Sequence, residues 1–293
     1  MDRIESKKLR SILFRHLDGI SICSTVGILY KQGVIEYILN NKKFTIIQII
    51  DKFNCNPGYI NIALRLLASQ GWIERFISDD EKEIDFLITD KGERIFVYAE
   101  YYYIFFSSIS VFKNIKQSIF EKKDSDVLDK YLFLIKTLKK MSNLKNIDTS
   151  VNLEMTIHLQ GLLIGPILVS IGTTNYFDDI INRNLDINFN ILCRECPGIK
   201  LVKEVFIYLD LIENKNNKFY FTQKGKFFIK RSSSYGVTVS YLPTFEKIKY
   251  LLFGDPEVLW KKNSNDLEMH VDRTMNVWGS GGAHKLYFKK IDD

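Results

Sequence analysis

Most of the residue patterns that identify a function directly are missing from this 293-residue sequence. It has only four cysteines, of which Cys193 and Cys196 have the CxxC spacing. A structural zinc site needs four ligands, and no second pair stands at metal-binding spacing, so we expect no metal. Residues 1–10 are charged and no cleavable apolar stretch follows them, which predicts a cytoplasmic protein with reduced thiols.

Long apolar runs and glycine-rich nucleotide turns are also absent. The longest apolar stretch, residues 157–172, is interrupted by His158, Gln160 and Pro166 and is shorter than the ~20 residues that cross a bilayer. It therefore predicts a buried helix, and we expect no membrane association. None of the 16 glycines forms G-x-G-x-x-G after a strand, so the sequence offers no Rossmann-type turn for a dinucleotide.

Positive charge is in slight excess but is dispersed. The 41 basic and 35 acidic residues leave a net charge of +6, and the lysine pairs are scattered along the chain. Proteins that bind nucleic acid usually concentrate basic residues on one face. The charge pattern therefore favours solvated surface lysines, and binding to nucleic acid is kept as an alternative.

What the sequence does contain is a helix followed by a two-stranded ribbon, over residues 63–92. Leu64 and Leu67 share one helical face, and Gly71 tolerates the left-handed conformation that ends a helix. The ribbon is predicted from three consecutive signals, namely a strand start at Trp72-Ile73, an acidic turn over residues 79–83 and a returning strand over residues 86–89.

A helix-turn-helix is predicted directly before this ribbon. Thr45 is the expected N-cap of a helix over residues 46–53. Asn56 and Pro57 then begin the next helix, with proline in its first turn. Two helices followed by a ribbon are typical of a winged-helix unit.

The same order of signals occurs a second time, which predicts an internal duplication. Five short matches appear in the same order: His16-Leu17-Asp18-Gly19 with His158-Leu159-Gln160-Gly161, Pro57-Gly58 with Pro197-Gly198, Ile73-Glu74 with Ile212-Glu213, Thr89-Asp90-Lys91-Gly92 with Thr222-Gln223-Lys224-Gly225, and Phe112 with Phe245. The sequence therefore predicts a mostly helical α+β protein built from tandem winged-helix-like units.

The expected domains are a first winged-helix-like unit over residues 1–145, a second over 146–255, and a C-terminal segment rich in glycine and tryptophan over 256–293. The remaining expected helices lie over residues 1–17, 20–40, 98–120, 121–145, 157–172, 174–181 and 201–209, and the second ribbon over 211–222. The helix over residues 98–120 is rich in aromatic residues.

The C-terminal segment is the stretch that most resembles a binding site. It contains two of the four histidines, His270 and His284. Residues 283–292 predict a helix, and residues 279–282 predict a flexible turn whose backbone N–H groups would face an anion at the helix N-terminus. Trp278 is expected either to cover a ligand or to anchor the segment by packing. We assign no complete catalytic set.

The C-terminal sequence HVDRTMNVWGSGGAHKLYF, with LASQGWIE and ITDKGE in the first unit, resembles the N-terminal region of S-adenosylmethionine-dependent methyltransferases associated with polyketide synthases. The resemblance covers all 293 residues, and the C-terminal sequence is its most specific part. It implies a substrate-binding, lid and scaffold region that is not complete as a catalyst. S-adenosylmethionine would bind only together with a Rossmann-like domain. The chain is expected to be either a fragment of a longer enzyme that carries this domain or a free-standing lid and scaffold protein that lost or shares its catalytic partner.

The resemblance also implies roles for individual residues and partners. His284 would be catalytic, orienting the acceptor or moving a proton, because imidazole titrates near neutrality. His270 and Arg273 would bind the substrate, a small-molecule or carrier-bound acyl group, and a homodimer is a further expectation. The residues expected to contact the cofactor are Asn276, Trp278, Gly279, Ser280, Gly281 and Gly282.

Two other function classes remain open. A winged-helix DNA-binding transcriptional regulator would read bases from the second helix of each helix-turn-helix. A structural interaction module would pair two chains through an exposed aromatic face over residues 98–112. The candidates for reading DNA are Tyr59, Asn61 and Arg65 in the first copy and Lys200, Lys203 and Glu204 in the second. Neither set has the several Arg, Asn or Gln side chains that base readout favours.

Overall fold

The computed structural model describes residues 2–78, 84–121, 125–144 and 147–292. In this part of the chain helices dominate, and two small antiparallel sheets complete the mostly helical α+β fold that the sequence predicts. The predicted acidic turn over residues 79–83 lies outside the described residues.

The local signals of the first half are confirmed. Thr45 and Gln48 form a capping box at the start of α3, each side chain accepting a hydrogen bond from the other residue's backbone N–H. Gly71, which follows α4, has a φ of +69°, a conformation that favours glycine. The elements of this half are α1 (Arg3–Lys31), α2 (Val34–Asn41), β1 (Lys43–Thr45), α3 (Ile46–Phe53), α4 (Pro57–Ser69), β2 (Ile73–Ile77), β3 (Ile84–Ile88), α5 (Asp90–Phe96), α6 (Ala99–Phe106), α7 (Ile109–Lys113), α8 (Ile115–Phe120) and α9 (Ser125–Ser142).

The second half repeats this order. Its elements are α10 (Thr149–Thr174), α11 (Asp178–Arg183), α12 (Phe189–Glu195), α13 (Ile199–Tyr208), β4 (Ile212–Lys215), β5 (Lys218–Phe221), α14 (Gln223–Ile229), α15 (Ser233–Ser240), α16 (Leu242–Glu246), α17 (Ile248–Phe253), a short 3-10 helix η1 (Pro256–Leu259) and α18 (Arg273–Asp292). Helices α10 to α17 follow one another as α1 to α8 do, with β4 and β5 in the places of β2 and β3. A bridge between Ile187 and Phe219 stands where β1 pairs in the first half. The predicted duplication is therefore confirmed as a repeated order of elements.

Each ribbon packs beside the helix that precedes it, β2 on α4 and β4 on α13. In the first sheet, ordered β1-β3-β2, Phe44 pairs with Phe86 and their ring centroids are 5.5 Å apart. In the second, β4 and β5 are joined through Asn216 and Asn217, both with positive φ, as a tight hairpin turn requires.

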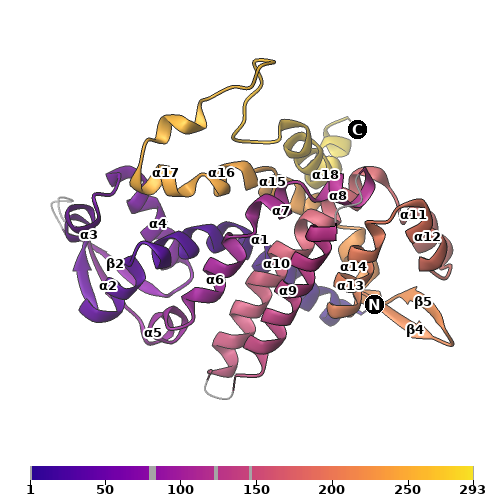
Figure 1. The fold of residues 1–293 in the computed structure, drawn as a ribbon, viewed down its shortest axis with the longest axis horizontal. Coiled ribbons are helices and arrows are strands. Elements are labelled where there is room, and N and C mark those ends of the chain that lie inside the picture. The colour runs from indigo at the N-terminus through magenta and orange to yellow at the C-terminus, as the bar shows by residue number, and fades with distance from the viewer. Residues whose placement is uncertain (1, 79–83, 122–124, 145–146, 293) are drawn as a thin grey trace.

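The two halves meet where α1 packs across α10, near the centre of Figure 1. A side chain at Gly19 would overlap the backbone of His158, and one at Gly161 would overlap the backbone of His16. A glycine in each helix therefore lets the partner backbone approach closely. This contact explains why the sequence His-Leu-x-Gly occurs in both halves.

Each half also covers the second helix of the other half's helix-turn-helix. The backbone N–H of Asn56, at the start of α4, donates to the Leu252 carbonyl in α17 over 2.8 Å. Equivalently, the Cys196 thiol, just before α13, donates to the Ile119 carbonyl in α8 over 2.8 Å. Figure 1 shows α15, α16 and α17 running across the molecule toward α4. The two winged-helix units are therefore interlocked.

The predicted domain boundaries lie between helices. The first falls between α9, which ends at Ser142, and α10, which begins at Thr149, and the second falls between α17 and η1. Buried apolar side chains from both halves form one continuous core. The boundaries, which stay a prediction, would thus separate repeats that share a core.

The predicted single aromatic helix over residues 98–120 is wrong. The segment forms the three short helices α6, α7 and α8. Between α6 and α7, the hydroxyls of Ser107 and Ser108 donate to backbone carbonyls of the preceding turn, which competes with continuation of the helix. The bends bury Tyr102 and Phe112 completely, so the exposed aromatic face that an interaction module would use is not present.

Two other helix predictions are corrected. The helices predicted over residues 1–17 and 20–40 are one helix as far as Lys31, and the break falls at Gly33, where φ is +79°. The helix predicted over residues 174–181 begins only at α11, because Asn175 ends α10 in the left-handed conformation. In both places a residue with positive φ sets the boundary.

Two described helices, α1 and α10, are long and apolar enough to cross a membrane by length and composition alone. Within the protein, 67% of the apolar window of α1 and 83% of that of α10 is buried. Core helices of globular proteins share these properties, so the evidence for a membrane span is weak. The buried helix predicted over residues 157–172 is confirmed as part of α10.

Candidate functional site

Within the C-terminal segment, residues 273–292 form one helix, α18, which packs on α15 of the second unit (Figure 1). The predicted flexible turn at Gly279, Ser280, Gly281 and Gly282 is wrong, because all four residues lie within this helix. Gly279 is buried, and a side chain there would come within 2.7 Å of the Val237 backbone nitrogen. This glycine therefore permits close helix packing, and the run forms no anion-binding turn.

Trp278 anchors the same helix contact. Its ring lies against Gly172 of α10 and Gly236 of α15, at the edge of the main core. Gly282 packs against Ser233, whereas Gly281 faces open space. Of the two roles expected for Trp278, the geometry supports the packing anchor.

Hydrogen bonds hold the start of α18 on the second unit. The Asp272 backbone N–H donates to the Ser240 carbonyl, and the Asn276 side-chain amide donates to the Ser240 hydroxyl, each over 3.0 Å. The Asp272 carboxylate accepts from the Met275 backbone N–H over 2.9 Å, as a helix cap does. The Asn276 amide is thus bonded within the protein.

The other predicted site residues are not brought together. The His270 ring meets Trp260 edge-on, with centroids 5.8 Å apart, and its buried Nδ1 has no hydrogen-bond partner among the described residues. Arg273 is exposed and its Nε donates to Glu268 over 2.6 Å. His284 is exposed further along α18. The substrate-binding and catalytic roles of these residues stay predictions.

A cavity of about 360 Å³ opens beside the start of α18, between the two halves. Asp272 and Met275 form one wall, α7 and α8 form another, and α10, α15 and α16 complete it. The lining is apolar at Phe112, Ile115, Pro166, Val239, Leu242, Pro243 and Met275, and polar at Lys113, Asn114, Lys116, Gln117, Glu121, Ser170 and Asp272.

Sequence reasoning misses this cavity. The one local signal is Pro166, because a proline inside an apolar helix leaves a gap in the backbone hydrogen bonding, and it lies on the cavity wall. The ion pair from Lys113 of α7 to Glu246 of α16, 2.5 Å long, joins corresponding helices of the two halves. The duplicated fold brings these distant segments together, and no local sequence pattern predicts that they form a cavity.

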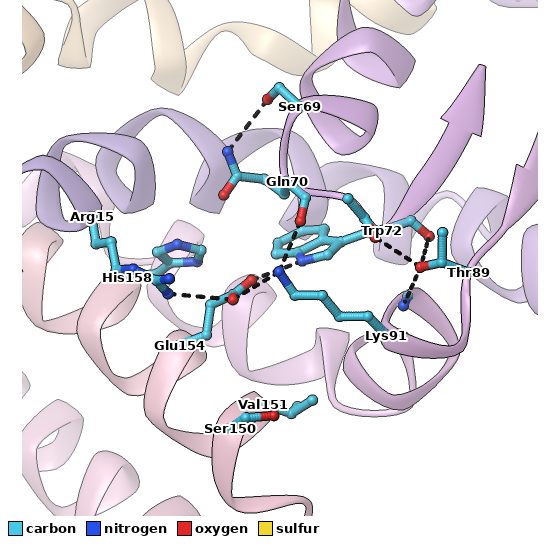
Figure 2. Close-up of polar contacts among 12 residues, drawn as sticks. Arg15, Ser69, Gln70, Trp72, Thr89, Lys91, Ser150, Val151, Glu154 and His158 are labelled. Atoms are coloured by element: carbon cyan, nitrogen blue, oxygen red, sulfur yellow. Dashed lines mark hydrogen bonds and ion pairs between the residues drawn. The ribbon is translucent and has the colours of Figure 1, made fainter. Parts of the chain in front are cut away.

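A buried polar cluster lies elsewhere, around Glu154 of α10 (Figure 2). The carboxylate accepts a hydrogen bond from Trp72 Nε1 over 2.9 Å and forms ion pairs with Lys91 at 2.8 Å and Arg15 at 3.3 Å. Burial by itself would raise the pKa of Glu154, but the bonds from Lys91 and Trp72 outweigh burial and lower it. Because the cluster joins α1 and α5 of the first half to α10 of the second, we interpret it as a set of contacts that stabilises the association of the halves.

Two buried histidines lie beside the crossing of α1 and α10. His16 Nδ1 is 2.8 Å from the Tyr235 hydroxyl, and His158 Nδ1 is 3.0 Å from the Tyr102 hydroxyl. Burial is the main cause that lowers the pKa of His16 to about 3 and that of His158 to about 4. Both rings are therefore neutral at pH 7, and their equivalent positions in the two halves indicate a structural role.

The CxxC pair offers no metal centre in the described part of the chain. Burial raises the pKa of both Cys193 and Cys196, and the Cys196 thiol is bonded to the Ile119 carbonyl. Among the described residues, no group of three or more His, Cys, Asp or Glu side chains could hold a metal ion. Cys196 occupies a buried packing position, and Cys193 is half-buried.

The DNA-reading ends of both helix-turn-helices are occupied. In such motifs the N-terminal residues of the second helix contact base edges. Here the start of α4 is bonded to α17, and Gly198, at the start of α13, lies against the backbone of Ile119 in α8. Further along α13, the Lys139 ammonium of α9 lies 5.7 Å from the centre of the Tyr208 ring.

The order of helix, turn, helix and ribbon defines the second half as a winged-helix domain, and comparison with known families agrees. A family model described as the AprA winged helix domain matches residues 160–255. A second, described as the AprA N-terminal domain, matches residues 9–75, from within α1 to the middle of β2. No curated protein matches the chain.

Proposed function

We propose that this chain is the substrate-binding, lid and scaffold region of an S-adenosylmethionine-dependent methyltransferase of polyketide or related secondary metabolism. The chain would not complete methyl transfer alone. The observation that carries the proposal is the position of α18. The segment through which the chain resembles those enzymes is docked on the second winged-helix domain, and its first turn forms a wall of the cavity.

The cavity is the proposed acceptor site. Its volume of about 360 Å³ lies within the roughly 300–1,000 Å³ of small-molecule sites. Apolar side chains such as Leu242 suit an acyl chain, and Lys116, Asn114 and Gln117 can donate hydrogen bonds to its carbonyl groups. A small-molecule or carrier-bound acyl substrate is therefore the proposed ligand.

In the run predicted to contact S-adenosylmethionine, three residues are already engaged by other parts of this chain. Trp278 and Gly279 are used in packing α18 on α15, and the Asn276 amide is bonded to Ser240, so they form no cradle for a nucleoside. The cofactor contacts predicted from the sequence for this run are not supported by the geometry. The cofactor would instead be held by a further domain.

The first test is titration calorimetry with S-adenosylmethionine. We expect no binding to this chain and micromolar binding to a protein in which α18 continues into a cofactor domain. Binding to the present chain at similar affinity would contradict the assignment of the cofactor to another domain. No binding to the longer protein would remove the methyltransferase proposal.

The second test fills the cavity. Met275→Trp places a large ring in the cavity wall and should raise the KM for the acyl acceptor in the longer protein about tenfold or more. Val277→Trp is the matched control, because this side chain is on the same helix and 70% exposed. Equal KM values for the two variants would show that the acceptor binds elsewhere.

A winged-helix DNA-binding regulator is the second candidate, favoured by the winged-helix class and the net charge of +6. The occupied ends of α4 and α13 oppose it. A gel shift on genomic DNA distinguishes the two, because phosphate contacts make affinity fall steeply with salt. We expect no shift at low salt, and a salt-dependent shift lost in Lys200→Glu/Lys203→Glu would favour the regulator.

A further inference from the structure

The exposed face of α1 carries a row of cations. Arg3, Lys7 and Arg10 follow at intervals of four and three residues, so their side chains lie on the same side of the helix. All three are exposed, and within the described part of the chain none of them forms an ion pair. The opposite face of α1, with Leu9 and Leu13, is buried in the core.

The row continues into an exposed aromatic side chain. Phe14 is the next residue in the same helical series and is 63% exposed. Together with Arg3, Lys7 and Arg10 it lines a shallow groove of about 610 Å³. Aromatic residues and arginine are enriched at protein interfaces, so an exposed phenylalanine beside two exposed arginines fits a contact surface.

Other charges near the row reinforce its positive character. Arg10 lies close enough to Arg231, after α14, for the two guanidinium groups to repel each other. Likewise, Lys8 lies close enough to Lys224 of α14 for the two ammonium groups to repel each other. On α1 itself the acidic side chains beside the row are Glu5 and Asp18.

We propose that this face, defined by Arg3, Lys7, Arg10 and Phe14, is a docking surface for an acidic α-helix of a partner protein. A helix with carboxylates at the same intervals would place one opposite each cation over about 10 Å of axis. Charge complementarity fixes the register and speeds association, while burial of Phe14 slows dissociation.

A protein helix fits this surface better than nucleic acid or lipid. Specific readout of bases also uses Asn or Gln, whereas the polar neighbours of the row are Ser11, Arg15 and the acidic Glu5 and Asp18, and Arg15 is paired with Glu154. A helix that lies on a membrane buries a broad apolar face, whereas between Arg3 and Asp18 the large apolar side chains exposed on α1 are Ile4 and Phe14 alone. The docking surface is independent of the methyltransferase assignment.

The experiment measures binding of a stapled helical peptide with glutamates at i, i+4 and i+7 and a leucine at i+11, by fluorescence anisotropy on the whole chain. We expect salt-dependent binding that Arg3→Glu/Lys7→Glu/Arg10→Glu weakens by about a hundredfold and Phe14→Ala by about tenfold. The matched control is Lys136→Glu/Lys140→Glu/Lys249→Glu, which changes the net charge equally at three other exposed lysines and should bind nearly as well as the parent.

Further ligands separate the alternatives. The same peptide with glutamine in place of glutamate should not bind, and a duplex DNA or vesicles of anionic phospholipid should bind more weakly than the acidic peptide. Equal losses of peptide affinity in both triple variants would show that binding depends only on the net charge of the protein, and this would overturn the proposal. Tighter binding to DNA or vesicles, or no binding of the acidic peptide at low salt, would also overturn it. Circular dichroism checks that each variant is folded.

Discussion

Glu154 joins side chains of both halves through three contacts. Its carboxylate contacts Arg15 on α1, Trp72 at the start of the first ribbon and Lys91 on α5 (Figure 2). The carboxylate is buried, whereas the side chains of Arg15 and Lys91 are 46% and 38% exposed. Water can therefore solvate these two cations in part if the carboxylate is lost.

The first prediction concerns this carboxylate. Glu154→Gln keeps an acceptor for Trp72 but removes the partner of two cations, and we expect the free energy of unfolding to fall by about 1–2 kcal/mol. Urea denaturation followed by circular dichroism measures it. Glu36→Gln, at an exposed position of α2, is the control and should change the value by less than about 0.5 kcal/mol. Equal effects in the two variants would contradict the interpretation that the Glu154 contacts stabilise the association of the halves.

The second prediction concerns pH. In the unfolded chain His16 and His158 titrate near 6.5, whereas in the folded protein their pKa values are about 3 and about 4. Their contribution to stability is complete above pH 6.5. Below it the unfolded state binds more protons, so the free energy of unfolding falls by up to about 1.4 kcal/mol per pH unit for each histidine. The lowered pKa of Glu154 adds loss in the same direction at lower pH.

Urea denaturation at several pH values between 7 and 4.5 tests this. His158→Gln should remove about half of the slope, because one of the two buried histidines no longer titrates. Asn143→Gln, at an exposed position and without a titratable group, should leave the slope unchanged. A wild-type protein whose stability does not vary over this range would contradict the buried neutral state of both rings.

Among the elements, the contact between α15 and α18 decides where the C-terminal segment lies. Gly279 and Gly236 face each other at this crossing, and Trp278 fills the space beside them. The helical conformation of the glycine run is thus maintained by tertiary packing, since glycine by itself disfavours a helix.

The third prediction compares two alanine substitutions in that run. Gly279→Ala should lower the free energy of unfolding by about 1–3 kcal/mol, because the added methyl group meets the backbone of Val237 and Gly236. Gly281→Ala meets nothing within 4 Å and should raise it by about 0.5–1 kcal/mol through helix propensity. Thermal unfolding and limited proteolysis of α18 measure both. Similar small effects at both positions would favour the flexible turn.

Across the molecule, helices α1 to α8 and α10 to α17 form two repeats that share one core. Helices α1 and α10 cross through Gly19 and Gly161, while α8 and α17 each cover a helix of the opposite half. Separating the halves would expose the buried faces of both long helices at once. Each half therefore depends on the other for its apolar burial.

The fourth prediction follows from this arrangement. Residues 1–145 and 146–293 produced separately should each lack a cooperative unfolding transition, whereas the two produced together should copurify and unfold in one transition. Circular dichroism and size-exclusion chromatography provide the measurements. Cleaving the intact folded chain between α9 and α10 is the control, and it should leave the halves associated. Two halves that are separately stable and monomeric would contradict the shared core.

Local sequence signals predict the winged-helix elements well. Thr45, Asn56 and Gly71 mark helix ends through hydrogen bonds or backbone conformations that act within a few residues, and the structure confirms them. The C-terminal site is predicted less well. Glycines within residues 279–282 indicate a turn by propensity, and only the opposing face of α15 makes a helix favourable there.

The sequence by itself determined the class of this protein, because caps, hydrophobic spacing and the repeated motifs act locally and specify two helix-and-ribbon units. Only the tertiary structure decided how those units pack against each other and where a cavity forms between them. Contacts between residues far apart in the chain place α8 and α17 on the opposite halves, form the cavity beside Asp272 and bury Glu154. Such contacts depend on which buried surfaces fit together, and that information is distributed over both halves.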